Sequence, residues 1–310
     1  VESAGQLAEL TNGLKQLKAD AVPLFLCVDE EGGRVSRMPE EVMDLPSADT
    51  FGQRHDASEL TRLGQTLGME CAAFGFNLDF APVADVRSNP ENTVIGDRAY
   101  SGDPGRAADA AAWVDGGMRE AGIISVWKHF PGHGNTATDS HQALPVVELS
   151  REDWARGDAV PFRRAVECGA PAVMAGHIRM TAFDPEYPAS LSHVLVSEVL
   201  REELGFTGVV CTDDLTMGAI SDTYGMGEAA VLAVEAGCDL LLVCHGADNL
   251  TQARQALLGA VDGGRISPAR LEESVYRILA LKAEYGLTNQ TVEAPDVAAL
   301  NQAVQALLGE

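Results

Sequence analysis

Five side chains that could carry acid/base or metal chemistry lie close together in the stretch KHFPGHGNTATDSH, residues 128–141. They are one lysine, three histidines and one aspartate: Lys128, His129, His133, Asp139 and His141. A proline and two glycines interrupt the stretch, so we expect a loop rather than a helix. Three interpretations fit it: a metal site, a catalytic acid/base with a sugar-binding clamp, or a polar loop without chemistry.

Asp139 and His141 could form an acid/base pair. They are two residues apart, so in an extended segment their side chains share one face. An aspartate that holds one imidazole nitrogen fixes the tautomer and raises the basicity of the other nitrogen, as a general acid/base requires. A metal site stays an alternative, although the proline and glycine between His129 and His133 disfavour the helix that their spacing needs. At least one of the three histidines is expected only to hydrogen-bond within the loop.

A second pair of candidates ends an apolar run, GVVCTDD at residues 208–214. Adjacent side chains on a strand point to opposite sides, so only one of Asp213 and Asp214 can face a common cavity. A buried carboxylate at a strand end is costly unless it is paired or used. We therefore expect Asp213 to be the nucleophile and Asp214 to have a structural role, such as capping the next helix.

Two further loops supply arginines. Asp29 ends an apolar run, and the glycine-containing loop VDEEGGRVSRM at residues 28–38 then carries Arg37. Arg98 lies in the polar loop at residues 88–103, where its five donors could bind sugar hydroxyls. Ion pairs without a catalytic role are the alternative interpretation for both loops.

Short apolar runs separated by helical patterns must position these side chains. The runs are residues 22–29, 76–85, 123–130, 172–178, 208–213 and 239–244. The helical patterns cover residues 2–18, 57–74, 105–121, 192–204, 227–236 and 247–261. Apolar strands that alternate with helices predict a parallel sheet covered on both faces. Because nearly every run ends in a polar residue, we expect an α/β fold of the TIM-type (β/α)8 barrel, whose strand ends converge at one mouth.

Six runs are too few for such a barrel. The chain opens with a helical pattern, which normally follows a strand, so we expect a first strand upstream of Val1. The last strand is expected to be short or irregular, near residues 263–268. Two helices, at residues 267–284 and 295–308, should then close a single catalytic domain that spans residues 1–310.

Bulk composition limits the partners and the compartment. The net charge is −24, and such an acidic surface repels phosphate backbones, so nucleic acid is not an expected partner. No stretch approaches the roughly 20 apolar residues of a membrane-spanning helix. The six cysteines form no CxxC pair and fall mostly in apolar runs, which favours a reducing, cytoplasmic location. Export or a lipid anchor stays open, because a chain that begins at Val1 is expected to lack its true N-terminus.

Five motifs, in order along the chain, resemble a known family. They are VDEEGGRVSR, VIGDRAY, KHFPGHG followed by DSH, AGHI and TDDLTM. Together they are similar to glycoside hydrolase family 3, in its β-N-acetylglucosaminidase branch. The resemblance implies a barrel enzyme that removes terminal β-linked N-acetylglucosamine with retention of configuration. It also implies no metal and no cofactor, an oligosaccharide substrate such as a peptidoglycan fragment, and a bacterial role in cell-wall recycling. We expect a monomer or a weak homodimer.

The resemblance implies roles for single residues as well. Asp213 would attack the anomeric carbon, His141 would protonate the leaving oxygen and then activate water, and Asp139 would be the partner of His141. The sugar subsite would be lined by Asp29, Arg37, Arg98, Lys128, His129 and, near the mouth, His177. Many family members carry a second domain with a glutamate acid/base, for which this chain is expected to have no room.

Three alternatives remain. Phosphate could replace water as the acceptor and give a sugar 1-phosphate, because an imidazole repels an anion less than a carboxylate does. A metal-dependent barrel hydrolase would use His129, His133, His141 and His177. A sugar-binding protein with a degenerate site is disfavoured, because a binder has no use for a nucleophile.

Overall fold

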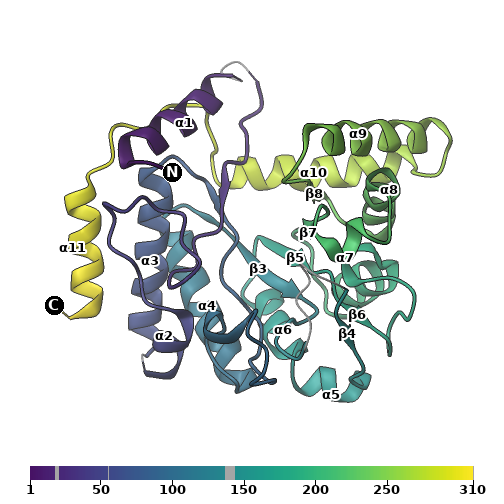
Figure 1. Ribbon diagram of the computed structural model, residues 1–310, viewed down its shortest axis with the longest axis horizontal. Helices are drawn as coiled ribbons and strands as arrows, with labels where there is room; N and C mark the ends of the chain where they lie inside the picture. Colours follow the sequence, from purple (N-terminus) through teal and green to yellow (C-terminus); the bar gives the residue numbers. More distant parts are fainter. Residues whose placement is uncertain (18–20, 55, 137–143, 310) are drawn as a thin grey trace.

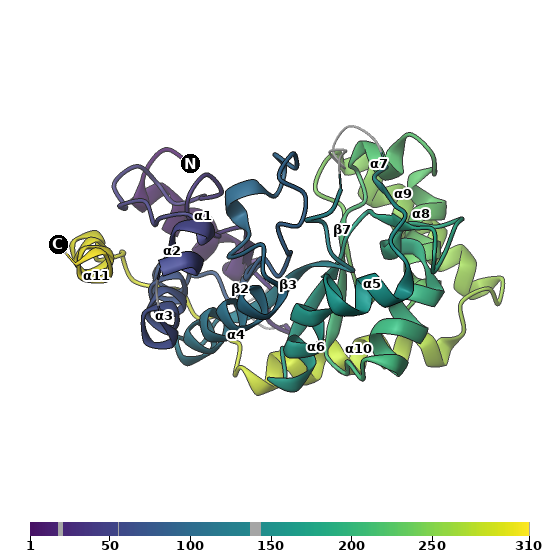
Figure 2. The same ribbon diagram turned by 90° about the horizontal axis from the view of Figure 1, so that it is seen from below.

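The computed structural model describes residues 1–17, 21–54, 56–136 and 144–309. Within these ranges six strands form one parallel sheet: β1 (Cys27–Val28), β2 (Leu78–Asp79), β3 (Ile124–Phe130), β5 (Ala172–Ala175), β7 (Val209–Asp214) and β8 (Leu240–Leu242). Their spatial order is β1-β2-β3-β5-β7-β8. The sheet curls into a half-barrel with helices around it, as Figures 1 and 2 show. The α/β, TIM-like architecture predicted from the alternating runs is confirmed.

The strands are apolar throughout because both faces of the sheet are covered. All seven residues of β3 are buried, and its apolar side chains are divided between two apolar clusters. Ile124 and Val126 belong to the cluster that also contains Leu281 of a C-terminal helix. Trp127 and Phe130 belong to the larger cluster that joins the sheet to the helices outside it. This double burial explains why the sequence shows continuous apolar runs instead of strict alternation.

The helices follow the strands much as their sequence patterns predict. The longer ones are α1 (Ala4–Gln16), α3 (Ala57–Ala73), α4 (Pro104–Glu120), α8 (Met226–Ala236), α9 (Ala247–Asp262), α10 (Pro268–Glu284) and α11 (Val297–Leu308). Local signals set several ends. Asp56 and Glu59 form a capping box at the start of α3, and Gly237 ends α8 with a φ of 118°. Gly64 lets α3 approach α4 closely, because a Cβ there would lie 2.0 Å from the Val114 carbonyl oxygen.

Shorter elements connect these layers. They are α2 (Ala48–Arg54), η1 (Gly96–Arg98), β4 (Val146–Val147), α5 (Arg151–Arg156), α6 (Ala159–Glu167), β6 (Arg179–Met180), η2 (Ala189–Leu191), η3 (Val194–Glu203) and α7 (Gly218–Ser221). Strands β4 and β6 pair with each other in a separate two-stranded sheet. The segment predicted as a helix at residues 192–204 is the π-helix η3. Sequence patterning missed α2, α5 and α6, whose apolar faces are short.

The structure differs from the predicted eight-stranded barrel in its last strand and in the closure of the sheet. The expected last strand near residues 263–268 is wrong, because these residues form the turn between α9 and α10. Gly264 has a φ of 75°, and the amides of Arg265 and Ile266 bond back to the Ala260 carbonyl. In the part of the chain that the structure describes, β1 and β8 are the two edges of the sheet, so the circle of eight strands is not completed. The strand expected upstream of Val1 lies outside the described residues.

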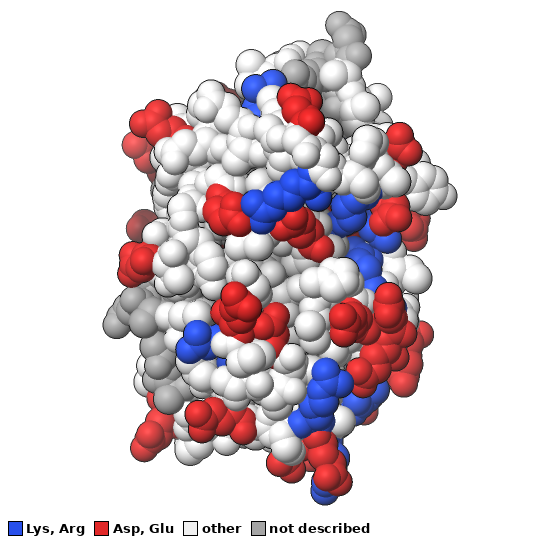
Figure 3. Space-filling view, turned by 90° about the vertical axis from the view of Figure 1, so that its right-hand side faces the viewer, with Lys and Arg blue, Asp and Glu red and all other residues white. Residues whose placement is uncertain are grey.

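The surface is as acidic as the composition indicates. The chain carries a net charge of −24, and Figure 3 shows acidic side chains spread over one face with basic side chains beside them. Over the residues that can be described, no helix has the length and apolar character needed to cross a bilayer.

Candidate active site

The carboxyl ends of the strands surround a cavity of about 840 Å³. Six of the residues predicted from sequence line it: Asp29, Arg37, Arg98, Lys128, His129 and Asp213. Asp29 follows β1, Lys128 and His129 lie in β3, and Asp213 lies in β7, so strands far apart in sequence bring these groups together. The polar ends of these strands thus converge at one mouth, as expected for a barrel.

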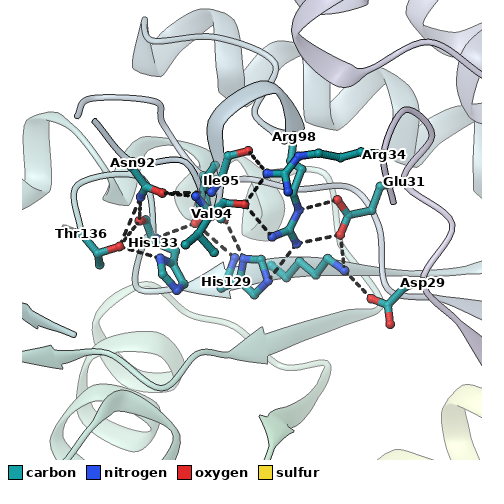
Figure 4. Close-up of polar contacts among 12 residues, drawn as sticks. Asp29, Glu31, Arg34, Asn92, Val94, Ile95, Arg98, His129, His133 and Thr136 are labelled. Atoms are coloured by element: carbon teal, nitrogen blue, oxygen red, sulfur yellow. Dashed lines mark hydrogen bonds and ion pairs between the residues drawn. The ribbon is translucent and has the colours of Figure 1, made fainter. Parts of the chain in front are cut away.

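Glu31 holds two cations of this cavity in place. Its carboxylate accepts two hydrogen bonds from Arg98, from Nε and Nη2, both of 2.8 Å. Lys128 Nζ lies 2.6 Å from Glu31 Oε1 and also 2.6 Å from Asp29 Oδ1. Figure 4 shows Arg98 between this carboxylate and His129, with Asp29 at the far end of the network. The fork geometry of the guanidinium fixes its orientation as well as its charge.

These contacts decide the charge states of the three groups. Burial alone would raise the pKa of Glu31, but the charges of Lys128 and Arg98 hold it at about 2. Burial would lower the pKa of Lys128, but Glu31 and Asp29 raise it to about 12. The pKa of Arg98 is raised as well, since the charge of Glu31 outweighs the effect of burial. The site therefore presents fixed cations at neutral pH.

Asp85 orients His129 and the backbone of His133, as Glu31 orients Arg98 and Lys128. His129 Nδ1 lies 2.7 Å from Asp85 Oδ2, and the backbone N–H of His133 donates to Oδ1 over 2.6 Å. Because a carboxylate only accepts, Nδ1 of His129 carries the hydrogen, and Nε2 is left to face Arg98 Nη2 at 3.5 Å. Burial would raise the pKa of Asp85, but His129 and His133 lower it. The aspartate thus fixes the ring orientation of His129.

Hydrogen bonds hold the start of the loop that follows β3. Asn92 Nδ2 donates to the His133 carbonyl oxygen over 2.8 Å, and Thr136 Oγ1 lies 2.8 Å from His133 Nδ1. Figure 4 shows these three side chains on one side of the network. The predicted acid/base pair, Asp139 and His141, comes directly afterwards and lies outside the described residues.

Asp213 and Asp214 at the end of β7 have different surroundings. Asp213 is half-buried on the cavity wall, and its Oδ1 accepts the backbone N–H of Asp214 over 2.8 Å. Burial would raise the pKa of Asp213, but its surroundings lower it, among them His129, the hydrogen bond from the Asp214 N–H and the charge of Lys128. Asp214 Oδ1 accepts the N–H groups of Thr216 and Cys244, both over 3.0 Å, so it anchors two loops. Asp213 is consequently an ionised carboxylate on the cavity wall. Asp214 lines the same cavity, contrary to the expectation that only one of the two would, and its carboxylate holds two loops instead of capping the next helix.

Two predicted sugar-binding residues, Arg37 and His177, differ in their exposure. Arg37 is exposed on the cavity wall and its Nη1 donates to the Ser36 carbonyl oxygen over 3.0 Å. Its own N–H is fixed by Glu30 Oε2 at 2.7 Å. His177 follows β5 and is fully buried, and its ring nitrogens contact Ser190 Oγ and the Asp214 carbonyl oxygen. This position fits a supporting role for His177 better than the direct sugar contact expected from sequence.

Sequence reasoning missed Glu31 and Asp85 as site residues. Glu31 follows Asp29 by two positions in VDEEGG, and Asp85 ends an apolar run, so both had a detectable signal. A buried carboxylate requires partners, and the predicted lysine, arginine and histidine were available for that purpose. Their pairing was hidden because the partners lie far away along the chain.

A parallel half-barrel whose strand ends bring an ionised carboxylate and fixed cations to one cavity is an arrangement typical of barrel glycoside hydrolases. The family model described as "Glycosyl hydrolase family 3 N terminal domain" matches residues 1–281. This chain belongs to glycosyl hydrolase family 3, as the five motifs predicted.

Known relatives agree with this assignment. A beta-hexosaminidase of Nitrosomonas eutropha is 34% identical over 312 residues, which cover 98% of this chain and 88% of that protein. The structure of a family 3 β-N-acetylglucosaminidase from Paenibacillus sp. str. FPU-7 has a TM-score of 0.92 and 40% identity, covering 98% of this chain and 60% of that one. The β-glucoside phosphorylase BglX, solved with 2FGlc bound, has a TM-score of 0.89 and 27% identity, covering 98% of this chain and 57% of that one.

Proposed function

We propose that this protein is an exo-β-N-acetylglucosaminidase that removes terminal β-linked N-acetylglucosamine with retention of configuration. The observation that carries the proposal is Asp213: a carboxylate with a lowered pKa, placed at the mouth of a cavity with fixed cations. The names of the relatives, a beta-hexosaminidase and a family 3 β-N-acetylglucosaminidase, supply the substrate class. The cavity volume of about 840 Å³ leaves room for more than one sugar ring.

The reaction would proceed in two displacements. In the first, the Asp213 carboxylate attacks the anomeric carbon while His141 gives its proton to the departing glycosidic oxygen. In the second, His141 takes a proton from water, the oxygen attacks the same carbon, and Asp213 leaves as a carboxylate. Two inversions give net retention. A carboxylate that stays ionised at neutral pH suits the attacking role, and an imidazole with an ordinary pKa of about 6.5 suits proton transfer in both directions.

The remaining groups would bind the sugar. Lys128 and Asp29, which lie 2.6 Å apart at the cavity wall, would offer a donor and an acceptor to sugar hydroxyls. Arg98 and His129 present N–H and imidazole groups on the same side, and Arg37 flanks the opening. Asp139 would orient His141 by binding one ring nitrogen. We further propose that residues 1–310 act as one catalytic domain.

The test is release of a chromophore from the β-N-acetylglucosaminide and from the β-glucoside. We expect preference for the acetamido sugar, and loss of activity in Asp213→Ala and His141→Ala by factors on the order of 1,000 or more. Equal activity of Asp213→Ala and wild type would contradict the proposal. A chelator is the control for metal dependence: we expect no loss, whereas revival by zinc or manganese would support the metal hydrolase.

Phosphorolysis is the second candidate, favoured by the similarity to a β-glucoside phosphorylase. In that reaction the phosphate oxygen, instead of water, would attack the glycosyl–Asp213 intermediate and yield a sugar 1-phosphate. Assays in phosphate and in a non-phosphate buffer, with the products separated by anion exchange, distinguish the two. Free N-acetylglucosamine in both buffers indicates hydrolysis, and a sugar phosphate that grows with phosphate concentration indicates phosphorolysis.

A further inference from the structure

We propose that His177 is a positioning residue for the nucleophile: a neutral imidazole that fixes the end of β7 through a hydrogen bond to the backbone of Asp214. The inference rests on the proposed function, because it concerns the carboxylate that would attack the sugar. It assigns His177 no contact with substrate.

The two ring nitrogens have unlike partners, and these define the tautomer. Nε2 lies 2.8 Å from the carbonyl oxygen of Asp214, and Nδ1 lies 2.7 Å from Ser190 Oγ. A carbonyl oxygen can only accept, so Nε2 must carry a hydrogen. In a neutral ring Nδ1 then has no hydrogen and accepts one from the serine hydroxyl. Each partner thus satisfies one nitrogen.

The surroundings of the ring favour its neutral form. His177 has no exposed surface, and burial is the main cause that lowers its pKa, against the raising effect of the Asp213 carboxylate. Protonation would place a second hydrogen on Nδ1, opposite a serine hydroxyl that already has its own hydrogen. The hydroxyl could turn to accept it, but the buried cation would still lose its hydration. The imidazole therefore serves as a hydrogen-bonding spacer, with no proton to transfer.

Ser190 is held so that it can set the ring orientation. Its backbone N–H donates to the Gly176 carbonyl over 3.2 Å, and the neighbouring Ala189 N–H donates to the Ile178 carbonyl over 2.8 Å. These two bonds flank His177 along the chain. The serine is itself fully buried in η2. The loop after β5 and the η2 segment are therefore hydrogen-bonded to each other, and together they fix the position of the imidazole.

Asp214 links the His177 imidazole to the nucleophile Asp213 through hydrogen bonds. Its carbonyl is bound by His177, its carboxylate binds the N–H groups of two loops, and its own N–H donates to Asp213 Oδ1 over 2.8 Å. The same carbonyl also accepts the Met217 N–H over 3.0 Å, so loss of the imidazole would leave it one donor of two. The backbone of residue 214 would then be held less tightly, and the N–H that aims the Asp213 carboxylate could shift. Misplacement of a reacting group by about 1 Å can cost about 100-fold in rate.

The experiment compares three variants for kcat and KM on the β-N-acetylglucosaminide. His177→Phe fills the space without a donor, His177→Gln keeps an amide N–H near the position of Nε2, and Ser190→Ala removes the hydroxyl that donates to Nδ1. We expect kcat of the Phe variant to fall about 100-fold with KM changed less than about 3-fold. The Gln variant should recover about 10-fold of this loss, and Ser190→Ala should lose less than the Phe variant. Melting temperatures show that each variant is folded at the assay temperature.

Two results would overturn the inference. A raised KM with unchanged kcat in His177→Phe would mean that the imidazole contacts substrate. Losses that follow the unfolded fraction, with no recovery in His177→Gln, would mean a purely structural histidine.

Nitrogen NMR of histidine-labelled protein gives a readout that needs no turnover. The chain has seven histidines, and the signal absent from His177→Gln identifies the relevant ring. We expect a neutral ring with its hydrogen on Nε2 that does not titrate between about pH 5 and 8. A hydrogen on Nδ1 or a titrating ring would overturn the inference while leaving the glycosidase intact. An inert wild type with the expected tautomer would instead refute the proposed function, and with it the role of His177 toward a nucleophile.

Discussion

Two pairs of carboxyl groups in this protein are equally buried and have opposite electrostatic surroundings. Glu31 and Asp85 are 5% and 0% exposed, and Glu70 and Asp79 are 1% and 0% exposed. The first pair accepts hydrogen bonds from Lys128, Arg98, His129 and His133. In the second pair, Glu70 Oε1 and Asp79 Oδ2 have no hydrogen-bond partner among the described residues. Burial alone therefore does not distinguish the two pairs, whereas their partners do.

The pKa values of the two pairs of carboxyl groups differ because their partners differ. Cations hold the pKa of Glu31 at about 2, despite burial. Burial raises the pKa of Glu70 to about 9, and the neighbouring acidic groups Glu30 and Asp79 add to the effect. Burial likewise raises the pKa of Asp79 well above its ordinary value. The first pair consists of anions that organise the active site, and the second of neutral acids beneath it, where Asp79 Oδ1 accepts the N–H of Glu30.

The largest effect is expected from Glu31→Gln, which removes the anion that Lys128 and Arg98 share. Breaking a buried ion pair by removing one partner costs about 3–5 kcal/mol, because the remaining charges stay buried. We also expect kcat/KM to fall by a factor on the order of 100 or more, since both cations lose their fixed orientation. Urea unfolding and initial rates measure the two effects.

A matched control exists on the surface. Glu228 binds Arg265 through both oxygens, but its side chain is 51% exposed. Glu228→Gln should cost no more than about 1 kcal/mol and leave activity unchanged. If the two variants behave alike, the contrast between buried organising carboxylates and ordinary ion pairs is wrong.

Asp85→Asn is expected to have the next largest effect. The amide is nearly the same shape but has no charge, and its nitrogen cannot accept the hydrogen of His129 Nδ1. The ring can then adopt the other tautomer, so we expect kcat to fall about 10- to 100-fold. Kinetics of the variant across pH check this. An activity within about 2-fold of wild type would show that Asp85 does not set the orientation of His129.

The smallest effect, with the opposite sign, is expected from Glu70→Gln. A carboxyl whose pKa rises from its ordinary value to about 9 on folding stabilises the folded state below the ordinary pKa, and this contribution is lost as the pH rises through about 9. The glutamine cannot ionise. The variant should therefore gain about 1 kcal/mol or more at pH 8 and nothing at pH 4. Unfolding at the two pH values tests this, and destabilisation at pH 8 would mean that Glu70 is an anion with a partner.

The sequence predicts the individual helices and strands of this fold better than it predicts how the strands pair to close the barrel. The capping box at Asp56 and Glu59 and the glycine at residue 237 are local signals, so helix ends were predictable. The strands were visible because both faces are apolar. The turn at residues 263–268 was mistaken for a strand, because the sheet edge depends on pairing between segments and leaves no local pattern.

The site was predictable where chemistry follows from residue type at a strand end, as for Asp213, Lys128 and His129. Pairings across the sequence were not, because nothing near Glu31 reveals that it meets Arg98 and Lys128. The supporting position of His177 was hidden for the same reason. Its partners Ser190 and Asp214 are 13 and 37 residues away, and only the fold brings them to the two ring nitrogens.

The most direct test of the account is to trap the glycosyl-enzyme. Wild-type protein is incubated with a 5-fluoro glycosyl fluoride of N-acetylglucosamine, which forms the intermediate faster than it is hydrolysed, and the digest is analysed by mass spectrometry. We expect one added sugar per chain, located on Asp213, and no adduct in Asp213→Ala. A label on another residue, or turnover that first releases the α-anomer without any adduct, would contradict it.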